Sequence, residues 1–398
     1  MQNDEEMKIA WFHSHLLHAN SGGTRFVIDY AIGLKQEFQH QVTIFCDCSS
    51  KEVVSRLNNE GISVVELDKY STNNFFYWLT LRSRIKRKQK KLRYVEKEFD
   101  YIVNSLFPMN VLVADFKVPK IQMCYEPFAF FYDSGFLRNF TASQRFFFRM
   151  MKVLYESDDK AAVNKMDRLL TLNKTNLPKI KAIYGRTATP VYAGIDPKVY
   201  HRAKPNEILK IRERYNGNPV LFHSSDLTGI KGTFPLLEVI KLVCSNYPEL
   251  KLLITVYIDV PDGINKLKNR IKELGLESNV EYLGCLPKEE LPVYYSSVDF
   301  VCQPSINQPA NWPLKEAMLC ETPIIGGAES EEANASNGGK INVLDTVESA
   351  AILSSLFATD RSRFVIDIEG LKKDYSIDSC IALFNEVILT ANANKENK

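Results

Sequence analysis

The order of strand-like and helix-like segments constrains this chain most. Residues 7–12 (MKIAWF) form a short apolar run typical of a buried strand. A loop ending in Gly22 and Gly23 follows, then an amphipathic helical pattern from Thr24, then a second apolar run at 41–45. Strand, glycine loop, helix and strand make a βαβ unit, and such units build parallel sheets.

A second series of the same kind begins near residue 218. It follows a segment rich in Pro, Asn and charge, which is typical of a linker. Strands are expected at 62–67, 101–104, 220–222, 250–258, 280–283, 299–302 and 323–325, and helices at 234–244, 264–274, 288–297 and 313–320. We therefore expect an α/β protein with two Rossmann-like domains, 1–200 and 201–374.

Length and composition agree with two domains. The chain has 398 residues, against about 150 for an ordinary domain. Its 45% hydrophobic and 25% charged content is that of a globular protein, and no run approaches the roughly 18 apolar residues of a membrane span. The acidic start argues against a secretory signal, and the eight scattered cysteines lack a zinc pattern. We expect a cytoplasmic protein without a metal site.

The net charge of +2 conceals two opposite halves. Residues 1–200 hold 29 Lys and Arg against 21 Asp and Glu, and residues 201–398 hold 21 against 27. The segment 82–93 has eight basic residues and no acid, and 125–155 has eleven aromatic residues with cations interleaved. This combination favours peripheral contact with an anionic membrane, at the inner face of that membrane. Nucleic-acid binding, or a buried helix beside a solvated charge run, would leave a similar pattern, and we predict no nucleic-acid partner.

Three loops carry candidate ligand chemistry, although the G-x-G-x-x-G and P-loop motifs are absent. Gly22 and Gly23 stand at a helix N-terminus, where backbone amides attract phosphate, and Arg25 adds charge. Lys231 follows a strand and would neutralise a diphosphate at the carboxyl edge of a sheet. Glu316 lies early on a helix and would accept hydrogen bonds from a ribose diol. Taken singly, the first two features are more often a glycine turn and a solvated loop lysine, and the alternative for Glu316 is a helix-surface carboxylate.

Seven segments resemble, in chain order, the GT-B glycosyltransferases of the retaining family 4, the glycosyl transferases group 1. Each segment is weak alone, and their order and spacing make the resemblance specific over almost the whole chain. The segments are 21–31 (SGGTRFVIDYA), 191–196 (VYAGID), 231–232 (KG), 274–284 (LGLESNVEYLG), 304–305 (PS), 316–318 (EAM) and 322–325 (TPII).

The resemblance implies a fold and a set of roles. Two Rossmann-like domains would face each other across a cleft, with the C-terminal segment 375–398 crossing back to the first domain. Such enzymes need no metal and use a nucleotide-diphosphate sugar as donor substrate rather than a cofactor. The implied catalytic residues are Gln308, Glu316 and Lys231, and the implied donor-binding residues are Gly22, Gly23, Arg25, Lys231, Ser305, Asn311 and Glu316.

The chain also departs from the family pattern. Gln308 stands where the family has the first Glu of a Glu-x7-Glu motif, and glutamine keeps hydrogen bonding but loses the charge. Asp226 replaces an Arg that faces the diphosphate. Tyr125 or Glu126 stands where the family often has His. These departures indicate an unusual donor or a loss of catalysis.

We therefore expect a glycosyltransferase that moves a sugar from a nucleotide diphosphate to a hydroxyl of a glycan or lipid-linked acceptor, with retention. Synthesis of cell-surface polysaccharide or glycoconjugate is the expected pathway. Two alternatives remain open at this point: a catalytically silent GT-B subunit that partners an active transferase, and a GT-B sugar-nucleotide epimerase.

Overall fold

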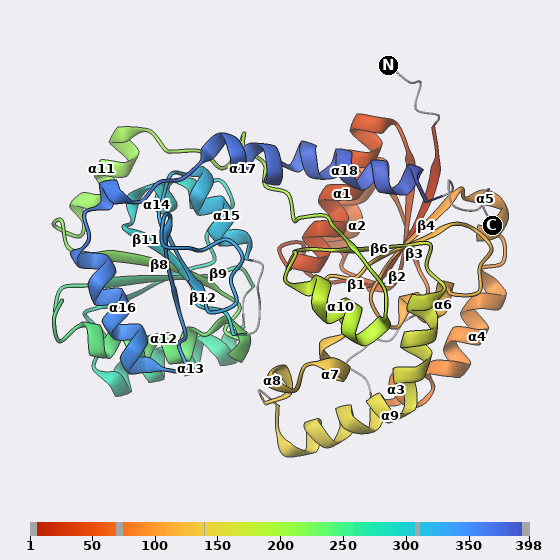
Figure 1. Cartoon of the computed structure of the whole chain (residues 1–398), viewed down its shortest axis with the longest axis horizontal. Helices are drawn as coiled ribbons and strands as arrows, with labels where there is room; N and C mark the ends of the chain where they lie inside the picture. Colours follow the sequence, from red (N-terminus) through yellow and green to blue (C-terminus); the bar gives the residue numbers. More distant parts are fainter. Residues whose placement is uncertain (1–5, 69–74, 139, 259, 307–310, 392–398) are drawn as a thin grey trace. The chain divides into compact units, whose positions relative to one another are not determined.

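The chain forms two compact units, Met1–Ala193 with Cys380–Lys398, and Gly194–Ser379. The computed structural model describes residues 6–68, 75–138, 140–258, 260–306 and 311–391 (Figure 1). Each unit is a sheet covered by helices, and each has its own hydrophobic core.

The sheet of the first unit has seven strands in the order β3-β2-β1-β4-β5-β6-β7, and its described pairings are parallel. The strands are β1 (Lys8–Leu16), β2 (Gln41–Ser49), β3 (Ser63–Glu66), β4 (Tyr101–Ser105), β5 (Lys120–Met123), β6 (Arg168–Thr171) and β7 (Thr189–Pro190). The helices are α1 (Gly22–Phe38), α2 (Lys51–Asn59), α3 (Phe75–Leu79), α4 (Leu81–Lys91), α5 (Val95–Glu98), α6 (Met109–Val113), α7 (Ala129–Tyr132), α8 (Ser134–Leu137), α9 (Ala142–Asn164) and α10 (Asn176–Tyr184).

The sheet of the second unit has six strands in the order β10-β9-β8-β11-β12-β13, again with parallel described pairings. The strands are β8 (Val220–Ser225), β9 (Lys251–Val256), β10 (Val280–Gly284), β11 (Phe300–Gln303), β12 (Ile324–Gly327) and β13 (Gly338–Ile341). The helices are α11 (Pro205–Glu213), η1 (Gly229–Lys231), α12 (Thr233–Val243), α13 (Pro261–Leu274), α14 (Leu291–Ser297), α15 (Trp312–Leu319), α16 (Thr346–Ala358), η2 (Arg361–Arg363) and α17 (Ile368–Tyr375).

The last described helix, α18 (Ile377–Leu389), packs in the first unit, where Figure 1 shows it beside α1. Phe384 stacks on Trp11 with 5.4 Å between ring centroids, and Asn385 hydrogen-bonds the His40 ring at 2.8 Å. The crossing back of the C-terminal segment, expected from the family resemblance, is confirmed. The helix that packs in the first unit begins at Ile377, since Tyr375 still belongs to α17 and Ser376 is extended and bridges to Ile195.

In both sheets, the order in which the chain adds strands reverses at one point. This point lies between β1 and β4 in the first unit and between β8 and β11 in the second. Helices leave the two neighbouring strands toward opposite sides there, so open α/β sheets bind ligands at the carboxyl ends of these strands. The two parallel sheets expected from the sequence are confirmed. The strands β6, β7 and β13 were not among those expected from the sequence.

Candidate functional site

Two loops of the second unit meet at the carboxyl ends of β8 and β11. The Ile306 N–H donates to the Ile230 carbonyl at 2.7 Å, so the two loops are joined directly. Gly232 has a φ of 71°, and a Cβ there would collide with the Pro304 carbonyl oxygen. Glycine is therefore required both by the backbone conformation and by the close approach.

Lys231 ends η1 in the first of these loops, as its predicted role requires. Its Nζ lies 6.0 Å from the centroid of the Tyr257 ring. Asp226, which stands where the family has an Arg, accepts hydrogen bonds from the Tyr257 hydroxyl at 2.6 Å and from the Thr228 hydroxyl. Burial opposes ionisation of Asp226, but the Lys231 charge and these donors outweigh it and lower the pKa of the carboxyl. The carboxylate is thus held within the loop and interacts with the Lys231 cation.

A buried histidine on β8 connects the elements that flank the same loop. His223 on β8 hydrogen-bonds the Cys302 carbonyl and the Thr233 hydroxyl, each at 2.9 Å. Burial lowers the pKa of His223 to about 4, so the ring is neutral near pH 7. With one proton to share, it serves as donor to one partner and acceptor from the other, which connects β8, β11 and α12.

Glu316 lies on α15 and is buried, with only 2% of its surface exposed. Its Oε2 accepts a hydrogen bond from the Tyr295 hydroxyl of α14 at 2.9 Å. Tyr295 is fully buried, and burial together with the Glu316 charge raises its pKa well above the ordinary value. The sequence alternative of a surface carboxylate on α15 is therefore wrong, because Glu316 is fixed inside the unit.

Ser305 and Asn311 belong to one buried polar network around Glu332. The Ser305 hydroxyl donates to Asn311 Oδ1 at 2.9 Å, and the Asn311 N–H donates to Glu332 Oε1 at 3.2 Å. Lys315 Nζ lies 3.6 Å from the same carboxylate oxygen and 4.8 Å from the centroid of the Tyr375 ring. Sequence reasoning missed Lys315 and Glu332. That Lys315 precedes Glu316 is visible in the sequence. Its ion-pair partner Glu332, however, follows 17 positions after Lys315 in an irregular segment.

Gln308, the predicted replacement for the first family carboxylate, lies outside the described residues. Pro309 and Ala310 lie outside them as well. The loop is described up to Ile306 and again from Asn311, which is the N-cap of α15.

Gly22 and Gly23 open α1 in the first unit, after the N-cap Ser21. A Cβ on Gly23 would lie 3.8 Å from the His13 ring and 3.9 Å from the Tyr125 ring. These rings come from β1 and from the segment after β5, so Tyr125, one of the two residues that stand where the family often has His, lies beside the glycine turn. Burial raises the pKa of Tyr125 and lowers that of His13 to about 3, which leaves both rings neutral.

His13 is a site residue to which the sequence gave no role. Its Nδ1 is buried and has no hydrogen-bond partner among the described residues. Arg25, by contrast, contacts an acid, since its Nε lies 3.4 Å from Asp29 Oδ2. Arg56 approaches the other oxygen of that carboxylate at 3.5 Å. The charge that Arg25 was expected to supply is therefore shared with Asp29.

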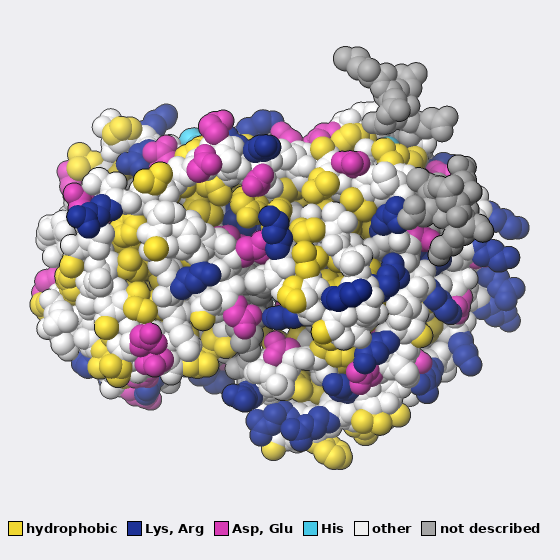
Figure 2. Space-filling view, in the orientation of Figure 1, with side chains coloured by type: hydrophobic (Ala, Val, Ile, Leu, Met, Phe, Trp, Pro, Cys, Tyr) yellow, Lys and Arg dark blue, Asp and Glu magenta, His cyan; other side chains and the backbone are white. Residues whose placement is uncertain are grey.

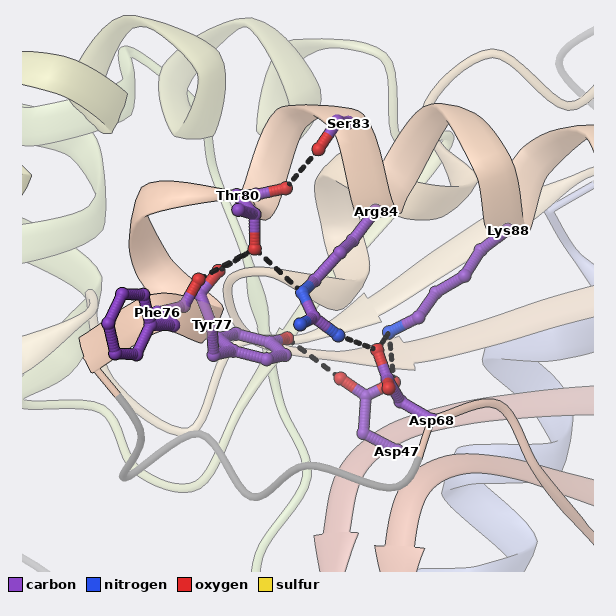
Figure 3. A network of polar contacts seen from close by, with 8 residues as sticks. All are labelled: Asp47, Asp68, Phe76, Tyr77, Thr80, Ser83, Arg84 and Lys88. Carbon is purple, nitrogen blue, oxygen red and sulfur yellow. Dashed lines mark hydrogen bonds and ion pairs between the residues drawn. The ribbon is translucent and has the colours of Figure 1, made fainter.

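The basic run at 82–93 forms α4, and part of it is structural rather than solvated. Lys88 is 5% exposed and contacts Asp47 and Asp68, and Arg84 binds Asp68 at 2.8 Å (Figure 3). Tyr77 donates to the second oxygen of Asp47 at 2.7 Å. These contacts fix α4 against β2. Arg84 and Lys88 are therefore paired with acids of the same unit, although the sequence suggested that the basic run faces an anionic partner.

A family comparison agrees with the site in the second unit. Residues 205–337 match the family described as Glycosyl transferases group 1, a range that includes Lys231, Ser305, Asn311 and Glu316. Spore coat protein SA of Bacillus subtilis is 24% identical over 187 residues, 43% of this chain and 48% of the relative. D-inositol 3-phosphate glycosyltransferase of Corynebacterium urealyticum is 27% identical over 149 residues, 35% of each chain. The matches thus span half or less of these curated relatives.

The fold comparison extends to the whole chain. The crystal structure of Anabaena Alr3699/HepE in complex with UDP has a TM-score of 0.73 at 17% identity, and the match covers 96% of this chain and 100% of that one. The same protein was also solved with UDP-glucose. The chain therefore has the GT-B fold, and its residues 205–337 match the glycosyl transferases group 1 family, as the resemblance in the sequence indicated.

Two features of the described part of the chain concern membrane spans and metal sites. No described helix is long and apolar enough to cross a membrane. Within the same residues, no group of three or more His, Cys, Asp and Glu is placed to hold a metal ion.

Proposed function

We propose that the chain is a metal-independent glycosyltransferase that moves a sugar from a nucleotide diphosphate to an acceptor hydroxyl. One observation supports this proposal most strongly. The residues that match the family include both loops at the carboxyl ends of β8 and β11, together with the buried Glu316 on α15. One protein of the same fold, Anabaena Alr3699/HepE, was crystallised with UDP and with UDP-glucose, which supports a nucleotide-sugar donor.

In this proposal Glu316 accepts hydrogen bonds from the ribose diol. The Tyr295 hydroxyl holds the carboxylate in place, so little side-chain freedom is lost on binding. Burial strengthens such charge-assisted hydrogen bonds. Ser305 and Asn311 fix the start of α15 through Glu332, and thereby keep Glu316 at a constant distance from the β11 loop.

Lys231 stabilises the leaving diphosphate. As the bond between the anomeric carbon and the phosphate oxygen breaks, negative charge grows on that oxygen, and a fixed ammonium group lowers the energy of this state. The acceptor hydroxyl attacks the same face of the sugar, and its proton passes to the leaving phosphate oxygen. This route retains the anomeric configuration and needs no separate base. The amides of Gly22 and Gly23 are proposed as further donors to the diphosphate.

We propose a hydroxyl of a glycan or lipid-linked molecule as the acceptor, in cell-surface polysaccharide or glycoconjugate synthesis at the inner face of the membrane. A relative whose name is spore coat protein supports a cell-surface product. The basic and aromatic character of the first unit supports contact with an anionic membrane.

One observation favours a second candidate, a silent GT-B subunit that partners an active transferase. Asp226 stands close enough to Lys231 for each charge to stabilise the other. A diphosphate must compete with this carboxylate for the Lys231 cation. If the carboxylate prevails, the loop holds a nucleotide weakly and supports no transfer.

Transfer by the purified chain distinguishes the two candidates. Nucleotide-sugar donors are incubated with acceptor glycans and lipid-linked acceptors, and released nucleoside diphosphate and product are measured by mass spectrometry. We expect turnover that falls about 100-fold or more in Glu316→Gln, because the ribose loses a charged acceptor. Glu321→Gln, exposed in the turn that follows the same helix, is the control and should keep full activity. Unchanged turnover in Glu316→Gln would refute the site, and no turnover with any donor would favour the silent subunit.

A further inference from the structure

The first unit contains a cavity of about 650 Å³ that the proposed donor site does not use. Its size lies within the range of about 300–1,000 Å³ that is usual for small-molecule sites. The cavity is lined by Ser14, His15, Trp78, Phe107, Pro108, Phe128, Phe130, Phe131, Phe140, Ser143, Gln144, Phe147, Phe148 and Met151.

The lining is aromatic and carries no acid, lysine or arginine among its described residues. Several rings touch each other, with centroids 4.5 Å apart for Phe130 and Phe148 and 5.1 Å apart for Phe107 and Phe131. Burial lowers the pKa of His15, which keeps that ring neutral. A charged or densely hydroxylated ligand would lose hydration inside this lining without finding enough partners, whereas a hydrocarbon would gain from burial.

The few polar lining residues belong to two separate elements. Ser14 and His15 lie near the carboxyl end of β1, at the sheet reversal point of the first unit. Ser143 and Gln144 lie in the first turn of α9 and are exposed to solvent. The apolar lining thus connects the sheet edge where α/β proteins bind ligands with the outer surface of α9.

That outer surface combines apolar and cationic side chains. Phe146 is 72% and Val153 is 83% exposed on α9, and the cations Arg149 and Lys152 lie between them in sequence. Figure 2 shows Lys and Arg side chains next to hydrophobic ones over α9, at the lower edge of the view. Exposed apolar groups edged by cations suit the interface of an anionic bilayer.

The helix is held rigidly behind this surface. Buried Asp159 of α9 accepts hydrogen bonds from Asn110 at 2.7 Å and from Tyr184 and Tyr132 at 2.9 Å each. A fixed helix keeps the first turn of α9, and with it the polar residues at the cavity, in a constant position.

We propose that this aromatic cavity binds the hydrocarbon chain of a membrane-borne anionic lipid that carries the acceptor hydroxyl. The inference rests on the proposed transferase function and names its acceptor class. The chain enters from the bilayer beside α9, and its polar head group lies toward Ser14 and His15, on the side of the glycine turn. The aromatic run that the sequence related to the membrane surface is thus a lipid-chain site.

The test is titration calorimetry of the full chain with farnesyl phosphate, kept below its micelle concentration. We expect saturable binding with one site per chain. Ser143→Trp obstructs the exposed end of the cavity and Met151→Trp fills its interior, so each should weaken binding about tenfold or more. Ser157→Ala, exposed on the same helix but outside the cavity, should change it less than about twofold. Inorganic phosphate should not compete.

Thermal unfolding of each variant shows whether it is folded, and Ser143→Trp alters only an exposed side chain if Met151→Trp proves unstable. Nucleoside diphosphate binding, measured on the same samples, should be unchanged, because the proposed donor residues Lys231 and Glu316 lie in the second unit. Nucleotide binding without saturable lipid binding would overturn this inference and leave the proposed function intact. Equal lipid affinity in wild type and both tryptophan variants would overturn it too, since binding would then occur elsewhere.

Discussion

The two units share a fold but differ in what lies at the carboxyl edge of the sheet. In the second unit, the loop at the reversal point holds Lys231 and Asp226, whose charges interact, and the buried carboxylate of Glu316 lies on α15. In the first unit, the corresponding point has neutral rings, His13 and Tyr125, and a neighbouring aromatic cavity. The same architecture therefore offers one edge suited to a charged ligand and another suited to an apolar one.

This difference changes the meaning of the charge split along the chain. The basic surplus of the first 200 residues suggested a uniformly cationic domain, yet Arg84 and Lys88 are paired with acids from β2 and the segment after β3. Cations that face outward, such as Arg149 on α9, stand beside exposed apolar residues instead. Local placement, rather than net charge, distinguishes the two units.

The largest expected effect concerns the charged edge. Lys231→Met should lower transfer about 100-fold, because the developing diphosphate charge loses its cation. Lys231→Arg should restore part of the rate, since it keeps the charge. Asp226→Asn tests the competition directly: steady-state kinetics should show tighter nucleotide binding when the carboxylate is neutralised. Weaker nucleotide binding in Asp226→Asn would show that Asp226 supports the donor instead of competing with it.

A buried pair in the first unit provides the next effect. Lys88→Met should destabilise the protein by about 3–5 kcal/mol, because it leaves Asp47 buried without a cation, whereas Asp68 keeps its ion pair with Arg84. Lys86→Met, exposed on the same helix, is the control and should change stability by less than about 0.5 kcal/mol. Denaturant unfolding measures both. Equal stability of the two variants would mean that the α4 network contributes little.

Two glycines with similar backbone angles allow the cost of backbone strain to be distinguished from the cost of a steric collision. Gly232 of the second unit and Gly185 of the first have φ values of 71° and 69°, but only Gly232 faces a backbone oxygen, that of Pro304. Gly185→Ala should cost about 1 kcal/mol from strain alone. Gly232→Ala should cost about 3 kcal/mol and also weaken nucleotide binding. A cost at Gly232 no larger than at Gly185 would contradict the close contact between the two loops.

The smallest effect is a pH dependence. The pKa of His223 is lowered to about 4 in the folded chain, so the unfolded chain binds a proton more readily. The stability contributed by the neutral ring is present above the ordinary pKa of about 6.5 and is lost as pH falls toward 4. We expect the loss of stability between pH 6.5 and 5 to be about 2 kcal/mol smaller in His223→Gln, while the loss that buried His13 contributes remains in both proteins. An unaltered pH profile in His223→Gln would contradict the assignment of this loss to His223.

Part of this arrangement was visible in the sequence and part was not. The parallel sheets, the glycine turn before α1, Lys231 and Glu316 follow from periodicity and from family spacing. Tyr295 and Glu332, which hold Glu316 and the start of α15, come from segments with no recognisable motif. The aromatic residues of 125–155 were evident, but their convergence around a cavity with Trp78 and Ser14 depends on tertiary packing. The pairing of Lys88 depends on Asp47, which is 41 positions away.

The central claim is that the second unit holds a nucleotide-sugar donor, and thermal unfolding with a panel of nucleoside diphosphates and their sugars tests it most directly. A ligand at about 100 times its dissociation constant stabilises the folded chain by about 2.7 kcal/mol, which raises the melting temperature by a few degrees. We predict such a rise for one nucleotide class, and its loss in Glu316→Gln. A melting temperature that no nucleotide shifts, or a shift that persists in Glu316→Gln, would contradict the account.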